Sequence, residues 1–198
     1  ALIPKQAPLS DAQLRQLALL RWRQPGKYLD WRTSPEKPAL TYLAGRQLEP
    51  ATPIPDPGKS RHATTAARFL QRHAELLALR SPAVELSLRS ESTDTLGYTQ
   101  LRFDQHHAGL SVWPCSLMVQ CDPRGNVTLM TGSYVPTPAE VDPVPALTPE
   151  AAETQARTHS LETRLAALHG RELLVYAPID RPARLAWRID LRGSLVRQ

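Results

Sequence analysis

The chain has 198 residues, a mass of 22.0 kDa and a formal net charge of +5. This length fits one or two domains, and a hydrophobic content of 41% favours small domains over a single thick core. No apolar run approaches the roughly 20 residues of a membrane-spanning helix. The positive charge could indicate nucleic-acid binding. However, the arginines are scattered and aromatic residues do not alternate with them, so a basic surface that attracts acidic partners is preferred.

The N-terminal part of the chain predicts a short helix and then irregular, extended structure. A capping-box pattern at Ser10–Gln13 opens the helix, and Pro25-Gly26 ends it. Residues 28–44 are extended without clear periodicity. Four prolines between residues 50 and 58 then exclude regular structure. We therefore expect residues 1–58 to form an N-terminal extension that ends in a proline-rich crossing segment.

A strong helix is predicted next, over residues 61–79, where apolar side chains recur at the 3.6-residue period. His73 lies on this apolar stripe. Its neighbours one turn away are Phe69 and Leu77, so a packed histidine is favoured over a metal ligand. Strict alternation of apolar and polar residues then predicts a half-buried strand over Val84–Arg89.

Three further strands are predicted at Tyr98–Phe103, Leu110–Cys121 and Asn126–Gly132. The sequence Asp122-Pro123-Arg124-Gly125 is typical of a type I turn, so it predicts an antiparallel hairpin of the last two strands. Cys115 and Cys121 lie in one of these strands, about 20 Å apart at ~3.3 Å per residue, which is too far for a disulfide. We expect residues 59–136 to form one domain.

The pattern of a helix followed by strands then repeats after a proline-rich linker at residues 137–147. Thr148, Pro149 and Glu150 are typical of a helix start, and the helix is predicted to run to Leu168, with Gly170 as its C-terminal stop. Strands at Glu172–Tyr176 and Leu185–Leu191 close a second domain, residues 148–198. The fold class is therefore α+β, in two halves.

No residues stand out as a catalytic apparatus. Metalloprotease, hydrolase and phosphate-binding motifs are absent from the sequence. His106 and His107 are adjacent, so on a strand they would point to opposite faces, and an exposed hairpin loop is preferred over a metal site. Asp94 and Asp104 are interpreted as solvated loop residues. The sequence predicts no catalytic residue, no metal ligand and no cofactor.

Several spacings nevertheless match a known family. They are Asp94-x-Leu-Gly97-x-Thr-x-Leu-Arg102-Phe-x-Gln105, Gly109-x-x-Val112, Asp122-x-x-Gly125 and Gly132-x-Tyr134. Together they resemble the fungalysin/thermolysin propeptide motif. Downstream, Leu147-Thr-Pro-Glu-Ala-Ala152 and Leu185-Ala-Trp187-Arg188-Ile-Asp190 look like the PepSY domain that follows this motif in thermolysin-like proenzymes. The resemblance thus covers most of the chain.

The resemblance implies a secreted, non-catalytic pro-region that inhibits a zinc metalloprotease and assists its folding. It also implies two cystatin-like halves, each a helix packed on an antiparallel sheet, with the second half truncated. The partner would be the protease catalytic domain, in cis or in trans, and neither nucleic acid nor membrane. The residues assigned to partner contact are Arg102, Gln105, His106, His107 and Arg188. Hydrogen bonding within the sheet is the alternative for Arg102 and Gln105. A secreted adaptor of the same fold, with no protease partner, is the alternative function.

Overall fold

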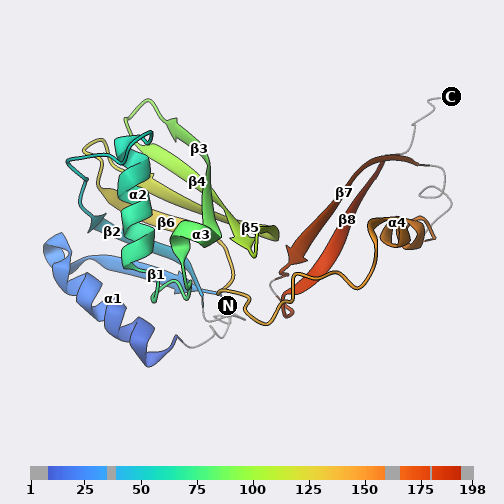
Figure 1. Ribbon diagram of the computed structural model, residues 1–198. Helices are drawn as coiled ribbons and strands as arrows, with labels where there is room; N and C mark the ends of the chain where they lie inside the picture. The colour runs from blue at the N-terminus through green and yellow to red at the C-terminus, as the bar shows by residue number, and fades with distance from the viewer. Residues whose placement is uncertain (1–8, 35–38, 159–165, 179, 193–198) are drawn as a thin grey trace, which may run out of the picture.

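The fold is α+β and is organised around one mixed sheet of eight strands (Figure 1). The structure is a computed structural model that describes residues 9–34, 39–158, 166–178 and 180–192. Six strands follow one antiparallel path, in the order β1 (Leu29–Thr33), β2 (Leu40–Glu49), β6 (Val127–Ser133), β5 (Leu110–Cys121), β4 (Thr99–His107) and β3 (Leu86–Thr93). The strand β7 (Ala167–Tyr176) pairs in parallel with β5 and antiparallel with β8 (Arg184–Arg192).

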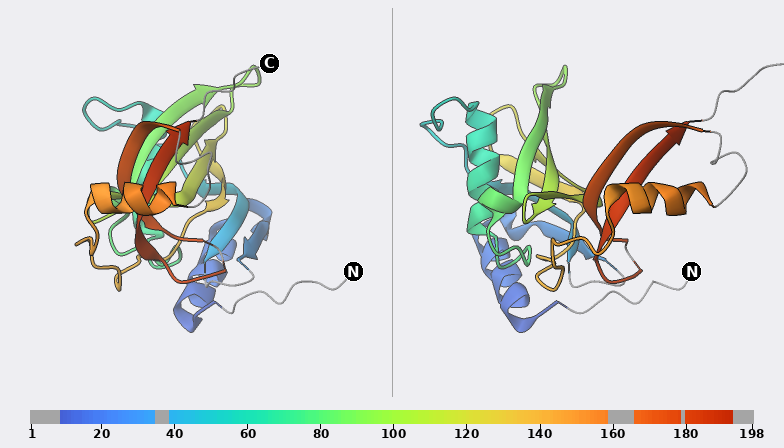
Figure 2. Two further views of the ribbon diagram at one scale, coloured as in Figure 1. Left: turned by 90° about the vertical axis from the view of Figure 1, so that its right-hand side faces the viewer. Right: turned by 45° about the vertical axis from the view of Figure 1, so that its right-hand side comes forward.

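The helices divide between two lobes. In the N-terminal lobe, α1 (Asp11–Arg23) and α2 (Arg61–Arg72) lie on the same side of the sheet, as the right-hand view of Figure 2 shows. The short helices η1 (Pro25–Lys27) and α3 (Pro82–Glu85) lead into β1 and β3. In the C-terminal lobe, α4 (Pro149–Arg157) lies beside the β7–β8 hairpin. None of the helices that the structure describes is long and apolar enough to cross a membrane.

Local sequence signals start the helices where they were predicted. The Ser10 hydroxyl accepts the Gln13 amide at 3.2 Å, and the Gln13 side chain accepts the Ser10 amide at 2.9 Å, so the capping box is confirmed. The Thr148 hydroxyl caps α4 by accepting the Ala151 amide at 3.2 Å. These bonds satisfy amide donors that have no partner inside a helix.

The predicted hairpin of β5 and β6 is also confirmed. The Gly125 amide donates to the Asp122 carbonyl at 2.8 Å, and the Asp122 carboxylate accepts the amides of Arg124 and Asn126. Gly125 has φ of 88°, a conformation that other residues rarely adopt. No disulfide joins Cys115 and Cys121, which both lie on β5.

The main core lies between the helices and the sheet. Phe69 and Leu70 of α2 are buried in one cluster with the inward residues of the strands. Cross-strand pairing places Leu101, Val119 and Met130 side by side in this layer. A second cluster joins the two lobes where β5 meets β7, and its buried members are Val112, Val135, Val141, Val175 and Ala177.

Several predicted element bounds were wrong. The second helix ends at Arg72 rather than Leu79, because the chain turns there and lets Leu76, Leu77 and Leu79 all reach the core. Val84 is 78% exposed in α3, and the strand begins only at Leu86.

The last helix was predicted to run to Leu168 but α4 ends at Arg157, while residues 159–165 fall outside the described part of the chain. Leu168 pairs with Leu191, and Gly170 lies in β7, not at a helix stop. Pairing with β8 overrides local helix preference here.

Candidate docking surface

No described helix covers the face of the six-stranded path that lies opposite α1 and α2. One row of cross-strand neighbours crosses this face from edge to edge, and its members are Arg32, Tyr42, Thr131, Met118, Arg102 and Ser90. A second row runs beside it through Asp30, Ala44, Leu129, Gln120, Gln100 and Ser92. We call these two rows the open face. All of its side chains are exposed or half-buried.

The open face carries few charged side chains, namely two arginines and one aspartate. It contains neither Lys nor Glu, and Asp30 is its one acidic residue. Tyr, Met and Arg are enriched at the centres of protein–protein interfaces, where Lys, Glu and Asp are depleted. Four strand spacings separate Arg32 from Arg102, which puts them about 19 Å apart. The open face is therefore a broad, nearly neutral strip with a cation towards each end.

Arg102 is the predicted contact residue that lies on this face. It projects from β4 and is exposed. None of the described acidic side chains forms an ion pair with it, in contrast to Arg89, whose guanidinium lies 3.5 Å from the Asp104 carboxylate. Arg32, at the other end of the row, stacks on Tyr42 with its guanidinium carbon 5.1 Å from the ring centre. A free guanidinium on a flat surface can pair with an acidic partner side chain.

Gln105 has a different role, because it is only 1% exposed. Its amide nitrogen donates to the Val135 carbonyl at 2.7 Å, and its amide oxygen accepts the Val135 N–H at 3.1 Å. The side chain thus bonds to Val135 as a paired strand would, at a point where the β4–β5 register is interrupted. The alternative of hydrogen bonding within the sheet holds for Gln105, and none of its surface is left for a partner.

His106 and His107 point away from each other, as adjacent residues on β4. The Nε2 atom of His106 lies 2.7 Å from the Ser87 hydroxyl, and that of His107 lies 3.3 Å from the Val141 carbonyl. They are therefore strand residues rather than residues of a hairpin loop. Among the residues that the structure describes, no group of three or more His, Cys, Asp or Glu side chains could hold a metal ion.

Arg188 lies apart from the other four predicted residues, on β8 of the C-terminal lobe, where it forms an ion pair with Glu172 on β7.

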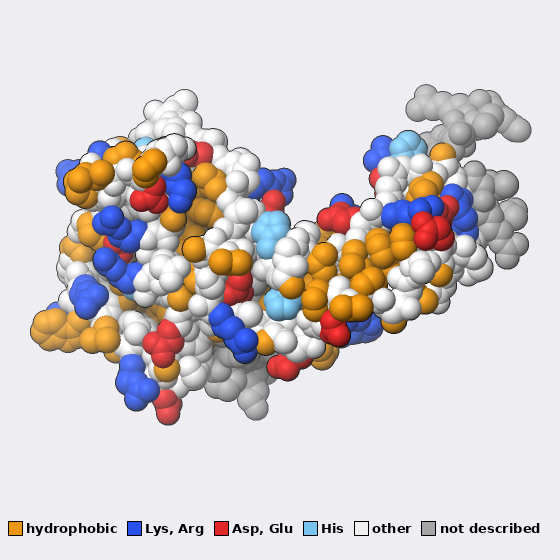
Figure 3. Space-filling view, in the orientation of Figure 1, with side chains coloured by type: hydrophobic (Ala, Val, Ile, Leu, Met, Phe, Trp, Pro, Cys, Tyr) orange, Lys and Arg blue, Asp and Glu red, His pale blue; other side chains and the backbone are white. Residues whose placement is uncertain are grey.

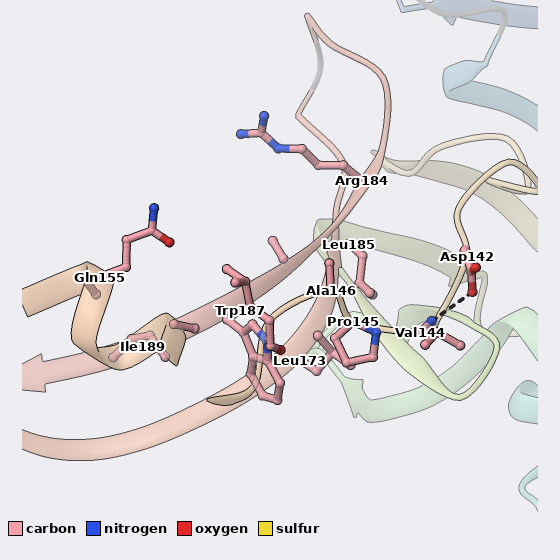
Figure 4. A pocket seen from close by; sticks show the side chains of 14 residues that line it. Asp142, Val144, Pro145, Ala146, Gln155, Leu173, Arg184, Leu185, Trp187 and Ile189 are labelled. Carbon is pink, nitrogen blue, oxygen red and sulfur yellow. Dashed lines mark hydrogen bonds between the residues drawn. The ribbon is translucent and has the colours of Figure 1, made fainter. Parts of the chain in front are cut away.

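Strand β8 also lines a cavity of about 730 Å³ between α4, the hairpin and residues 142–147 (Figure 4). Leu185, Trp187 and Ile189 alternate along β8, so they share one face of the strand, and all three line this cavity. The Trp187 indole N–H donates to the Leu147 carbonyl at 2.9 Å and so fixes the linker. Figure 3 shows the resulting band of hydrophobic side chains on this lobe.

A buried polar cluster in the N-terminal lobe was missed by sequence reasoning. The Glu49 side chain is 1% exposed and accepts a hydrogen bond from Arg72 at 2.9 Å. Burial raises the pKa of Glu49, and the nearby Arg72, Arg68 and Arg23 oppose that shift. His73 beside it is 5% exposed, so the prediction of a packed histidine is confirmed, and burial lowers its pKa to about 4. The one sequence signal for this cluster is the alternation of inward and outward residues along β2, and that alternation is irregular.

Comparison with known proteins finds similarity over parts of the chain. Residues 84–134 match the Fungalysin/Thermolysin Propeptide Motif, and this range contains all of β3, β4, β5 and β6. The chain is also 33% identical over 118 residues to the thermostable neutral protease NprT of Geobacillus stearothermophilus. That alignment covers 54% of this chain and 21% of the relative, so the chain spans about a fifth of the relative's length. Four adjacent strands of the sheet, from β6 to the edge strand β3, therefore match the fungalysin/thermolysin propeptide motif, and part of the chain is similar to a thermostable neutral protease.

Proposed function

We propose that this chain is a non-catalytic pro-region that binds the catalytic domain of a thermolysin-like zinc metalloprotease, inhibits it and assists its folding. The match of residues 84–134 to the propeptide motif carries this proposal. It is supported by the similarity to a neutral protease over part of the chain. Such a pro-region would act as an intramolecular chaperone and as the inhibitory part of a zymogen.

The open face is the docking surface that we propose for the protease. Four of its six strands belong to the propeptide match, and its Tyr42, Met118 and two arginines are residue types enriched at interface centres. The net charge of +5 would steer the chain towards an acidic protease surface. A preformed sheet can also hold partner segments in place while they fold, because its own strands are already ordered.

The finer organisation is part of the same proposal. We assign residues 59–136 to the motif domain, residues 137–147 to a linker and residues 148–198 to a PepSY-like domain. Each half would be cystatin-like, with α2 packed on the large sheet and α4 on the β7–β8 hairpin. Secretion follows from the proposed protease partner. We place that partner in cis or in trans.

The experiment adds the purified chain to a mature thermolysin-like protease, beginning with the neutral protease NprT. Peptide hydrolysis should fall with increasing chain concentration, and the yield of active enzyme after refolding from denaturant should rise. Arg102→Glu should weaken inhibition at least about tenfold, because it places a negative charge against the acidic surface of the protease. Arg89→Glu is the matched control on the neighbouring strand and should inhibit like the unmodified chain. A folded chain that neither inhibits nor promotes refolding would refute the proposal and favour the adaptor function.

A further inference from the structure

Helix α1 has an apolar side that the fold does not use. Leu17 and Leu20 point into the core and are each 3% exposed. Trp22 follows Leu20 by two residues, which is about 200° around the helix axis, so it lies on the outer side of α1. Trp22 is 76% exposed, and its outer neighbours Leu14 and Leu19 are 49% and 55% exposed. Surface helices normally carry polar residues on this side.

Two further aromatic residues extend this apolar surface beyond the helix. Tyr28 is 53% exposed and Trp31 of β1 is 36% exposed. A shallow groove of about 380 Å³ separates α1 from Trp31, and Leu14 and Trp22 line its helix side. We call Leu14, Leu19, Trp22, Tyr28 and Trp31 the outer patch. It contains two of the four tryptophans of the chain.

Most of the charges around the outer patch are positive, and the acidic exceptions are Asp11, one turn before Leu14, and Asp30, next to Trp31. Between Asp11 and Asp30 the chain has three arginines and one lysine and no acidic residue. The Lys27 ammonium lies 4.8 Å from the centre of the Trp22 ring, and the Arg21 guanidinium donates to the Lys27 carbonyl at 3.3 Å. Figure 3 shows hydrophobic side chains projecting beside blue ones at the left edge of the molecule, at the level of α1. Cations therefore lie next to the apolar residues of the outer patch.

We propose that the outer patch docks this protein onto a membrane surface that contains anionic phospholipid. Tryptophan and tyrosine prefer the depth of the lipid headgroups, and leucine enters the acyl region just below them. Arginine and lysine stems can lie along the apolar layer while their charges reach the lipid phosphates. Nothing in this inference depends on a protease partner. It replaces the expectation from the sequence that the chain has no membrane partner.

The shape of the patch favours lipid over a second protein. Helix α1 lies at an outer corner of the molecule, so its outer side chains project outwards (Figures 1 and 2). A deformable lipid layer can accept Trp22, Leu14 and Leu19 at once, whereas a protein would need a concave surface to reach all three. The absence of acidic residues between positions 12 and 29 also matches the negative potential of anionic membranes.

The experiment sediments the full chain with vesicles of phosphatidylcholine alone and with vesicles of equimolar phosphatidylcholine and phosphatidylglycerol. We expect binding to the anionic vesicles that weakens as salt is added. Trp22→Ser should reduce partitioning at least about tenfold, through loss of the largest inserted side chain. Arg21→Gln or Lys27→Gln should each reduce it about fivefold.

Leu96→Ser is the matched control, because Leu96 is 75% exposed in the loop before β4, away from α1. This variant should bind like the unmodified chain. Circular dichroism and thermal unfolding verify that Trp22→Ser remains folded, as expected for a side chain that contributes nothing to the core. Failure of the unmodified chain to bind anionic vesicles would overturn the proposal, as would equal binding by Trp22→Ser. If neither the unmodified chain nor Trp22→Ser binds vesicles, and Trp22→Ser also loses protease binding, the outer patch would be assigned to a protein partner instead.

Discussion

The hydrogen bonds of Gln105 offer the sharpest test of how this sheet is held together. Gln105 and Val135 are both buried, and the two bonds between them fix the chain where it leaves β6 for the linker. Gln105→Ala removes both bonds at once. The N–H and C=O of Val135 would then be buried without partners, unless water enters the space that the side chain leaves.

The expected loss follows from these two groups. Each buried backbone group left without a partner costs about 1–3 kcal/mol. Removing about four heavy atoms from a packed site adds a cavity cost. We therefore expect Gln105→Ala to lower the free energy of unfolding by about 3 kcal/mol. Gln120→Ala on the open face is the control, because Gln120 is half-buried on the neighbouring strand, and it should change stability by less than about 0.5 kcal/mol.

The measurement is equilibrium unfolding in urea, followed by far-ultraviolet circular dichroism. The midpoint should fall for Gln105→Ala while the slope stays constant, which indicates a change in stability rather than in the unfolded chain. Partner affinity of the folded fraction should not change, since Gln105 exposes almost no surface. A midpoint for Gln105→Ala equal to that of Gln120→Ala would refute the structural role and return Gln105 to the set of possible contact residues.

Three further predictions follow from other positions in the N-terminal lobe. Gly132→Ala should destabilise the β5–β6 pair by several kcal/mol, because a Cβ there would lie 2.3 Å from the Ser116 carbonyl oxygen, and Gly170→Ala, which meets no such contact, is the comparison in thermal unfolding. The pKa of His73, lowered from 6.5 to about 4, means that the unfolded chain binds the proton first. Stability should therefore fall as the pH drops from above 6.5 towards 4, by up to about 3 kcal/mol relative to His73→Leu. A difference in the free energy of unfolding between the unmodified chain and His73→Leu that stays constant over this pH range would contradict the prediction. Burial raises the pKa of Cys121 to about 12, so its thiol should resist alkylation until the chain unfolds, and rapid labelling of Cys121 in the native protein would be inconsistent with this structure.

The residues of the propeptide motif show why some functional assignments could be made from sequence and others could not. Arg102 and Gln105 are three residues apart in one strand, and the motif contains both. Alternation alone sends them to opposite sides of β4. Which side is open depends on where α1 and α2 pack, and this involves residues far away in the chain. The structure therefore shows that Arg102 is exposed and Gln105 is buried, although the sequence alone made both equally plausible contact residues.

Element ends were hardest to predict where tertiary contacts compete with local preference. The periodicity of residues 61–79 favours helix throughout, yet the chain turns at His73 so that Leu76 and Leu77 can be buried. The Gln13 side chain then donates to the Leu76 carbonyl at 2.9 Å, across 63 residues of sequence. Helix propensity contributes less than 1 kcal/mol per residue, which one buried leucine outweighs.

Local signals in the sequence were sufficient for the α+β class, the capped helix starts at Ser10 and Thr148, the Asp122–Gly125 turn and the propeptide resemblance. The caps and the turn depend on residues within a few positions of one another, and the fold class and the resemblance depend on the order and spacing of such local signals along the chain, so no long-range contact is needed to recognise them. The tertiary structure alone decided that β2 and β6 pair, that one side of the sheet stays open, and that Trp22 faces away from the core. These features depend on which distant segments pack together, because strand order and helix orientation are set by burial of the whole core rather than by local pattern.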